Sequence, residues 1–282
     1  MKVDVIGSNS LLFANLPPAS QVPGRTYRAS DVGPAPGILL TSDGTKYRPA
    51  GGRQVIAMRT TNPVTVQDLA GAVAETIGPF PGGLVAVGQR LELKSNYSIS
   101  GLGNGVRDVR FLVNTTDPNN FSAVASTATS NADLWGILYG VQEIGPSLSA
   151  VLGRRRNGGG LAVGSIGYGT FSIDLSSDWS AYIHLRSAAE TAVNISSATW
   201  AGGIATFNTA ADHTLAVGDK TVIAGVTPTG WNIPAGAIVL SVPTTTQFTV
   251  ALAADPGTYS TGGTSSRISN MISQSYVLEL VG

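Results

Sequence analysis

Cysteine is absent from this sequence of 282 residues, and only 12% of its residues are charged. Without cysteine the chain cannot build a disulfide scaffold or a thiolate site for metal or redox chemistry. Its 17 basic and 17 acidic residues balance, which argues against a nucleic-acid-binding surface and against a polybasic membrane-binding one. Stretches with the period of an amphipathic helix are nearly absent, and no apolar run is long enough to span a bilayer.

The opening residues, MKVDVIGSNSLLF, lack the apolar run of a signal peptide. We therefore expect a soluble protein that is made in the cytosol and does not insert into a membrane.

Apolar residues at every second position indicate half-buried strands in several parts of the sequence. One group lies within 169–196, where the alternating sets are Phe171, Ile173 and Leu175, then Ala181, Ile183 and Leu185, then Thr191, Val193 and Ile195. A second group has the inward residues Leu91, Leu93, Tyr97 and Ile99 in one strand and Val109, Phe111 and Val113 in the next. The pattern returns at the end of the sequence in Tyr276, Leu278 and Leu280. Residues 134–139 are apolar on both faces and form either a buried strand or a short helix.

Short strands at close spacing, with 35 glycines and 15 prolines and no long helix, are typical of a sandwich or barrel. We predict an all-β chain based on an eight-stranded, jelly-roll-like β-sandwich. The alternation changes character at 199–266, so we interpret that stretch as a small domain inserted into the sandwich. The sandwich then comprises 53–198 and 267–282, and residues 1–52 form an extended N-terminal arm that carries a short hairpin.

Two short extended pieces lie in the arm, RTYRASDVG (25–33) and GILLTSDGTKYRP (37–49). The Ser-Asp-Gly-Thr run in the second piece predicts a tight turn. This pattern resembles the N-terminal segment of many bacteriophage virion proteins, in which a similar hairpin precedes a β-sandwich fibre or decoration domain.

An apolar patch in the arm consists of Leu11, Leu12, Phe13 and Leu16, and two prolines follow it. An apolar segment that its own domain does not bury needs a partner surface, so these four residues are the candidate virion-docking site. The alternative is that residues 11–16 pack under the 25–49 hairpin of the same or a neighbouring subunit.

The insert contains the runs HTLAVGD (213–219), TPTGWN (227–232) and TTTQFTV (244–250), which alternate turns with short strands. This order resembles a small β-domain of phage structural and tail proteins that is described as immunoglobulin-like or as a compact barrel. No catalytic residues belong to that pattern, so the resemblance implies none in this chain.

His184 and His213 are the only histidines. A zinc site needs three or four ligands, so we predict structural roles for both histidines and no metal site. The aspartates are scattered singly, and neither a glycosidase-like pair of carboxylates nor a nucleophile or phosphate-binding motif is present. We therefore expect no cofactor and no enzymatic activity.

Arg154, Arg155 and Arg156 form the one cluster of charge, which we place at the tip of a hairpin within 148–168. They either keep that tip soluble or contact an acidic surface, on a capsid or on a host glycan. The four tryptophans offer platforms for stacking sugars, but their positions in or beside strands favour roles in the core; they are Trp135, Trp179, Trp200 and Trp231.

The two resemblances imply a structural component of a tailed-bacteriophage virion, a decoration or cement protein or a fibre. Its partners would be the major capsid or tail protein of the same virion and further copies of itself. Low charge on the strands favours self-association, and the trimer is taken from the phage proteins that the chain resembles. The alternative is a receptor-binding tail-fibre module that holds a host surface glycan, and a depolymerase is the third reading.

Overall fold

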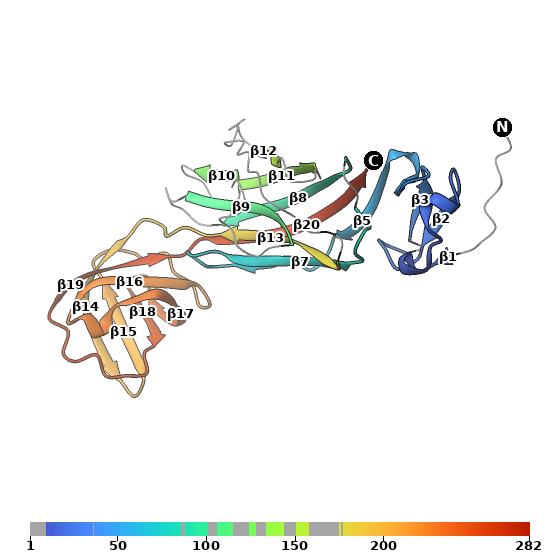
Figure 1. Cartoon of the computed structure of the whole chain (residues 1–282). Coiled ribbons are helices and arrows are strands. Elements are labelled where there is room, and N and C mark those ends of the chain that lie inside the picture. Colours follow the sequence, from blue (N-terminus) through green and yellow to red (C-terminus); the bar gives the residue numbers. More distant parts are fainter. Residues whose placement is uncertain are drawn as a thin grey trace.

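The computed structural model describes residues 10–35, 37–85, 88–100, 106–114, 124–127, 134–143, 151–157, 175 and 177–282. Figure 1 shows three β-structured parts in a row: an N-terminal module at one end, two sheets in the middle and a barrel at the other end. The described residues contain strands and short 3-10 turns but no α-helix. The prediction of an all-β chain is therefore confirmed.

The N-terminal module is a four-stranded sheet in the order β1-β2-β3-β4. Its strands are β1 (Ser10–Leu11), β2 (Thr26–Ala29), β3 (Ile38–Ser42) and β4 (Tyr47–Pro49). The predicted turn joins β3 to β4, and the carboxylate of Asp43 stabilises it by accepting hydrogen bonds from the backbone N–H groups of Thr45 (2.8 Å) and Lys46 (2.9 Å). Hydrogen bonds from Thr45, Lys46 and Arg48 hold the pKa of Asp43 well below its usual range.

Residues 10–24 do not form the extended arm that the sequence predicts. They contain β1 and two 3-10 turns, η1 (Phe13–Asn15) and η2 (Ala19–Gln21). The serine hydroxyl of Ser42 donates to the carbonyl of Ala19 at 2.7 Å, and the backbone N–H of Ser30 donates to the carbonyl of Leu11 at 2.9 Å. These contacts with the following strands fold the segment back onto its own module.

Two sheets form the middle of the molecule, one in the order β10-β9-β13-β7 and one in the order β12-β11-β8-β20-β5, with β6 also paired to β20. The first sheet contains β7 (Ala72–Phe80), β9 (Val106–Val113), β10 (Val124–Thr127) and β13 (Trp179–Arg186). The second contains β5 (Arg53–Arg59), β6 (Val64–Val66), β8 (Arg90–Ser100), β11 (Leu134–Glu143), β12 (Val151–Asn157) and β20 (Asn270–Val281). The last strand therefore completes a sheet, as the alternation predicts, and residues 134–139 are a strand. The predicted strand at 171–176 lies outside the described residues, apart from Leu175.

One hydrophobic core fills the space between the two sheets and continues into the N-terminal module. Leu91, Leu93 and Leu278 contribute from one sheet, Phe111 and Ile183 from the other, and all five are at most 3% exposed. The core also includes residues of the N-terminal module, namely Ala29, Val32, Ile38 and Leu40. Because the module shares this core, it is part of the same folded body.

The barrel is closed by six strands in the order β14-β15-β18-β17-β16-β19. These are β14 (Val193–Ala201), β15 (Ile204–Thr209), β16 (Lys220–Thr227), β17 (Ile233–Thr244), β18 (Gln247–Ala251) and β19 (Thr261–Arg267). Its separate core contains Phe207, Phe248 and Trp231, with ring centroids 5.4 Å apart for Phe207 and Phe248 and 5.6 Å apart for Phe207 and Trp231. The barrel thus begins at Val193, somewhat earlier than the 199 that the sequence pattern suggests.

The joint between the barrel and the sheets is a pair of hydrogen-bonded chain segments. One runs from β13 to β14 and the other from β19 to β20, and they meet in a bridge between Ala189 and Ile268. Backbone bonds flank this bridge, from Glu190 N–H to the Arg267 carbonyl (2.7 Å) and from Ser269 N–H to the Ala188 carbonyl (2.9 Å). The two ends of the barrel segment are therefore in direct contact.

Candidate functional site

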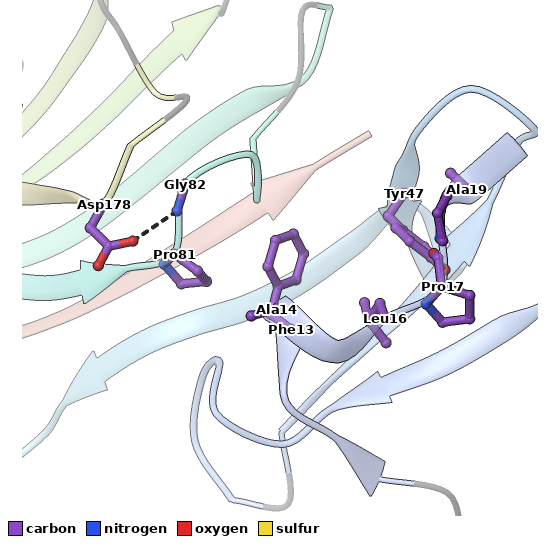
Figure 2. Close-up of a pocket in the computed structure, with 10 residues that line it drawn as sticks. Phe13, Ala14, Leu16, Pro17, Ala19, Tyr47, Pro81, Gly82 and Asp178 are labelled. Atoms are coloured by element: carbon purple, nitrogen blue, oxygen red, sulfur yellow. Dashed lines mark hydrogen bonds between the residues drawn. The ribbon is translucent and has the colours of Figure 1, made fainter.

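A pocket of about 430 Å³ lies between the N-terminal segment and a turn at one end of the central sheets. Its apolar lining includes Phe13, Leu16, Pro17, Pro18, Tyr47 and Pro81. Figure 2 shows the ring of Phe13 between the Pro81–Gly82 turn on one side and Tyr47 on the other. The volume falls within the range of small-ligand pockets, which commonly form where two parts of a fold meet.

Hydrogen bonds to residues far along the chain fix the N-terminal wall of the pocket. The backbone N–H of Phe13 donates to the carboxylate of Asp31 at 2.8 Å, and the hydroxyl of Tyr47 donates to the carbonyl of Pro17 at 2.7 Å. Burial, and to a smaller extent Tyr27, raises the pKa of Tyr47, so its hydroxyl keeps the proton that it donates. The wall is therefore set by the strands β2 to β4 beneath it.

The opposite wall is the turn that follows β7. Phe80 precedes this turn and packs against Trp179, with ring centroids 4.6 Å apart. The backbone N–H of Gly82 donates to one carboxylate oxygen of Asp178 at 3.1 Å (Figure 2). The turn and the start of β13 are thereby held together, and Asp178 lies at the rim of the pocket.

The four predicted docking residues divide between the pocket and the surface. Phe13 and Leu16 line the pocket and pack against the chain's own core, while Leu11 is half-buried in β1. Leu12 is 51% exposed. For Phe13 and Leu16 these contacts favour the alternative reading, in which the segment packs on its own 25–49 hairpin.

The predicted basic cluster occupies a different position from the one expected. Arg154, Arg155 and Arg156 lie inside strand β12 and are paired in register with Tyr139, Leu138 and Ile137 of β11, so they are not at a hairpin tip. The pairing with β11 accounts for this, because the antiparallel ladder extends as far as Asn157. The pocket does not include them.

Both histidines are buried, at 4% exposure each. His213 accepts a hydrogen bond from the backbone N–H of Leu215 at its Nδ1 atom (3.0 Å) and meets Phe248 edge-on, which agrees with a structural role. His184, predicted to point into solvent, is instead covered by a neighbouring turn. A Cβ on Gly71 of that turn would lie 2.3 Å from Cε1 of His184.

The tryptophans whose side chains are described also have places in the folded cores. Trp179 and Trp231 are each 1% exposed, so neither offers a platform to a sugar. Trp200 is half-buried, and its indole N–H donates to the carbonyl of Leu252 at 2.7 Å. The side chain of Trp135 lies outside the described residues.

A charge network that the sequence pattern does not reveal lies on the outer side of the six-stranded sheet. Glu92 of β8 is directly opposite Glu279 of β20, and Arg53 binds both carboxylates, the contact with Glu92 being 2.7 Å long. Lys94 adds a contact of 2.8 Å to Glu279. Burial raises the pKa of Glu279, but the hydrogen bonds from Lys94 and Arg53 outweigh this effect and hold the pKa below its ordinary value. Both carboxylates are therefore held in ion pairs with basic side chains.

Within the described ranges, histidine and acidic side chains do not gather in groups of three or more that could hold a metal ion. The same part of the chain contains no helix of the length and hydropathy needed to cross a membrane. Comparison of the chain with known protein families, with curated proteins and with solved structures gives no match.

Proposed function

We propose that this protein is a structural component of a bacteriophage particle, a decoration or fibre protein that docks through its N-terminal end. The supporting observation is the linear arrangement, with the N-terminal module at one end and the barrel at the other (Figure 1). A virion protein that attaches to the particle at one end and projects from it at the other needs its attachment module and its projecting domain at opposite ends. In this reading the central sheets are a jelly-roll-like sandwich and the barrel is the immunoglobulin-like projecting domain.

The docking surface of this proposal is the N-terminal module as a folded unit. Leu12 is exposed, and Phe13 and Leu16 lie in an open pocket beside it. Leu12 and the apolar lining of this pocket together form a larger apolar surface than a single exposed side chain, and larger apolar surfaces mark sites of protein contact. The module thus presents a preformed surface, which binds at a lower entropic cost than a disordered arm.

Particles that lack the native protein test this proposal directly. We expect the full chain to bind them, a chain that begins at Gly24 to fail, and a chain without the barrel (193–267) to bind as the full chain does. Cryo-electron microscopy of the decorated particles measures this. Equal binding by the chain that begins at Gly24 would contradict docking through the N-terminal end.

We also propose that the protein self-associates as a homotrimer. Large apolar side chains are exposed on the described surface, among them Met58 (49%) and Val73 (36%) of strands β5 and β7, which border the two sheets. Exposed apolar residues on a border strand favour association with another chain. Light scattering at micromolar concentration should give three times the mass of one chain, and a monomeric mass would contradict the proposal.

A further inference from the structure

The carboxylate of Asp178 is the one charged group among the described residues that line the pocket. One of its oxygens accepts the hydrogen bond from Gly82 at 3.1 Å. Among the described residues, none donates a hydrogen bond to the other oxygen or forms an ion pair with it. An exposed carboxylate therefore lies at the rim of an apolar pocket, and one of its two oxygens accepts no hydrogen bond from the described residues.

The contact with Gly82 does not require a charge at this position. A backbone N–H needs a single acceptor oxygen, and the amide oxygen of an asparagine would serve as well. The turn is thus stabilised without any need for the negative charge of Asp178.

Several carbonyl acceptors in the pocket are already used within the fold. The carbonyl of Phe13 accepts from Leu16 N–H, that of Pro17 from the Tyr47 hydroxyl, and that of Pro18 from Gln21 N–H. The carbonyl of Pro81 accepts from Leu84 N–H. A sugar ring, which carries many hydroxyl groups, would find one strong acceptor and little else, so the pocket fits a sugar poorly.

A basic side chain matches what the pocket offers. The aliphatic stem of a lysine or arginine packs well on apolar surface while its charged end stays at the rim, and the rings of Phe13 and Tyr47 supply such a surface. Aromatic faces also attract a nearby cation, and the carboxylate of Asp178 complements its charge.

We propose that this pocket receives a lysine or arginine side chain from the protein onto which the N-terminal end docks. This inference rests on the proposed function, because it names the chemistry of the docking partner. Asp178 supplies the charge that selects a basic residue, and Phe13 and Pro81 supply the surface for its stem.

Small probes test the pocket without any virion. In a titration followed by backbone amide NMR, N-acetyl-lysine amide should shift the signals of Phe13, Gly82 and Asp178, while N-acetyl-norleucine amide should bind two- to fivefold more weakly, as expected for an exposed ion pair. D178N should remove this preference for lysine and keep the turn. D255N is the matched control, because Asp255 accepts from Gly257 N–H (2.9 Å) in the barrel in the same way.

Three outcomes would overturn the inference: equal binding of the lysine and norleucine probes, an unchanged preference in D178N, or shifts at these residues with methyl glucoside in place of the lysine probe. The last outcome would identify the pocket as a sugar site. Particle binding by the wild-type chain reports on the proposed function separately. If the particles bind and the lysine probe does not, only the present inference fails.

Discussion

The buried hydroxyl of Ser269 should carry much of the stability of the joint between the barrel and the central sheets. Ser269 is 0% exposed, and its Oγ accepts from Nε of Arg107 at 2.9 Å and from the backbone N–H of Ala188 at 3.2 Å. The hydroxyl itself donates to the carbonyl of Ala188 at 3.0 Å. The guanidinium of Arg107 is also buried, and burial lowers its pKa while the charge of Glu190 partly offsets this effect.

S269A removes the hydroxyl without adding volume, and it takes away the acceptor for one N–H of a buried cation. A hydrogen bond to a charged group contributes about 1.5–3 kcal/mol, and a neutral one about 1 kcal/mol. Because the carbonyl of Ala188 keeps its bond from Ser269 N–H, the neutral loss is confined to the Ala188 N–H. We therefore expect a loss of about 3 kcal/mol in the free energy of unfolding.

Urea unfolding, followed by the fluorescence of the buried tryptophans, measures this loss. S275A is the matched control, because Ser275 lies in strand β20, which begins directly after Ser269, and accepts a single exposed hydrogen bond from Asn96 at 3.0 Å. It should cost about 0.5 kcal/mol or less. If S269A unfolds within that margin of the wild type, the hydroxyl does not stabilise the joint and the reasoning is refuted.

Three further predictions concern other parts of the chain. G263A should destabilise the barrel by at least ~2 kcal/mol in a thermal unfolding assay, because Gly263 has a φ of +97° and a Cβ there would lie 2.2 Å from the buried Val226. In the same assay, the control variant G203A should cost only about 1 kcal/mol, because Gly203 has a φ of +87° but open space around its Cβ. E279Q should lower stability above pH 4.5, the ordinary pKa of the carboxyl, and the difference from the wild type should shrink as the pH falls through the lowered folded-state pKa; a difference that grows in acid would contradict the assigned ion pairs. Replacing 193–267 with a short Gly/Ser linker should leave central sheets that unfold cooperatively, since the two cores share no residue, and loss of that cooperativity would show that the sheets depend on the barrel.

Period-two alternation predicts strands well in this chain but does not say which sheet a strand joins. The inward sets of β8 and β9 are buried as predicted. Val193 and Ile195 alternate in the same way as the residues of β13, so the pattern assigns them to the sandwich, yet they pair with β19 and β15 of the barrel. The partner of each strand, and therefore the residue at which the barrel begins, depends on contacts between distant segments, which the alternation of apolar residues does not predict.

Burial that depends on residues distant in the sequence is also not predicted by the alternation. Glu92 occupies an outward position of β8 but is 2% exposed, because Arg53 and Glu279 from other strands cover it. Phe13 and Leu16 likewise look like an unburied patch until Tyr47 and Pro81 are brought beside them. The pocket could not be found from the sequence, because its lining residues come from segments that are far apart in the chain, namely 13–19, Tyr47, 81–82 and Asp178.

The two segments of the joint have a mechanical consequence. The barrel is tethered by two chain segments, and each enters a different sheet: one leads from β13 and the other into β20. Both strands have a partner on each side, β9 and β7 for β13, and β8 and β5 for β20. A pull on the barrel along the long axis is therefore divided between the two sheets, and within each it is resisted in shear by ladders of hydrogen bonds on both sides of the loaded strand.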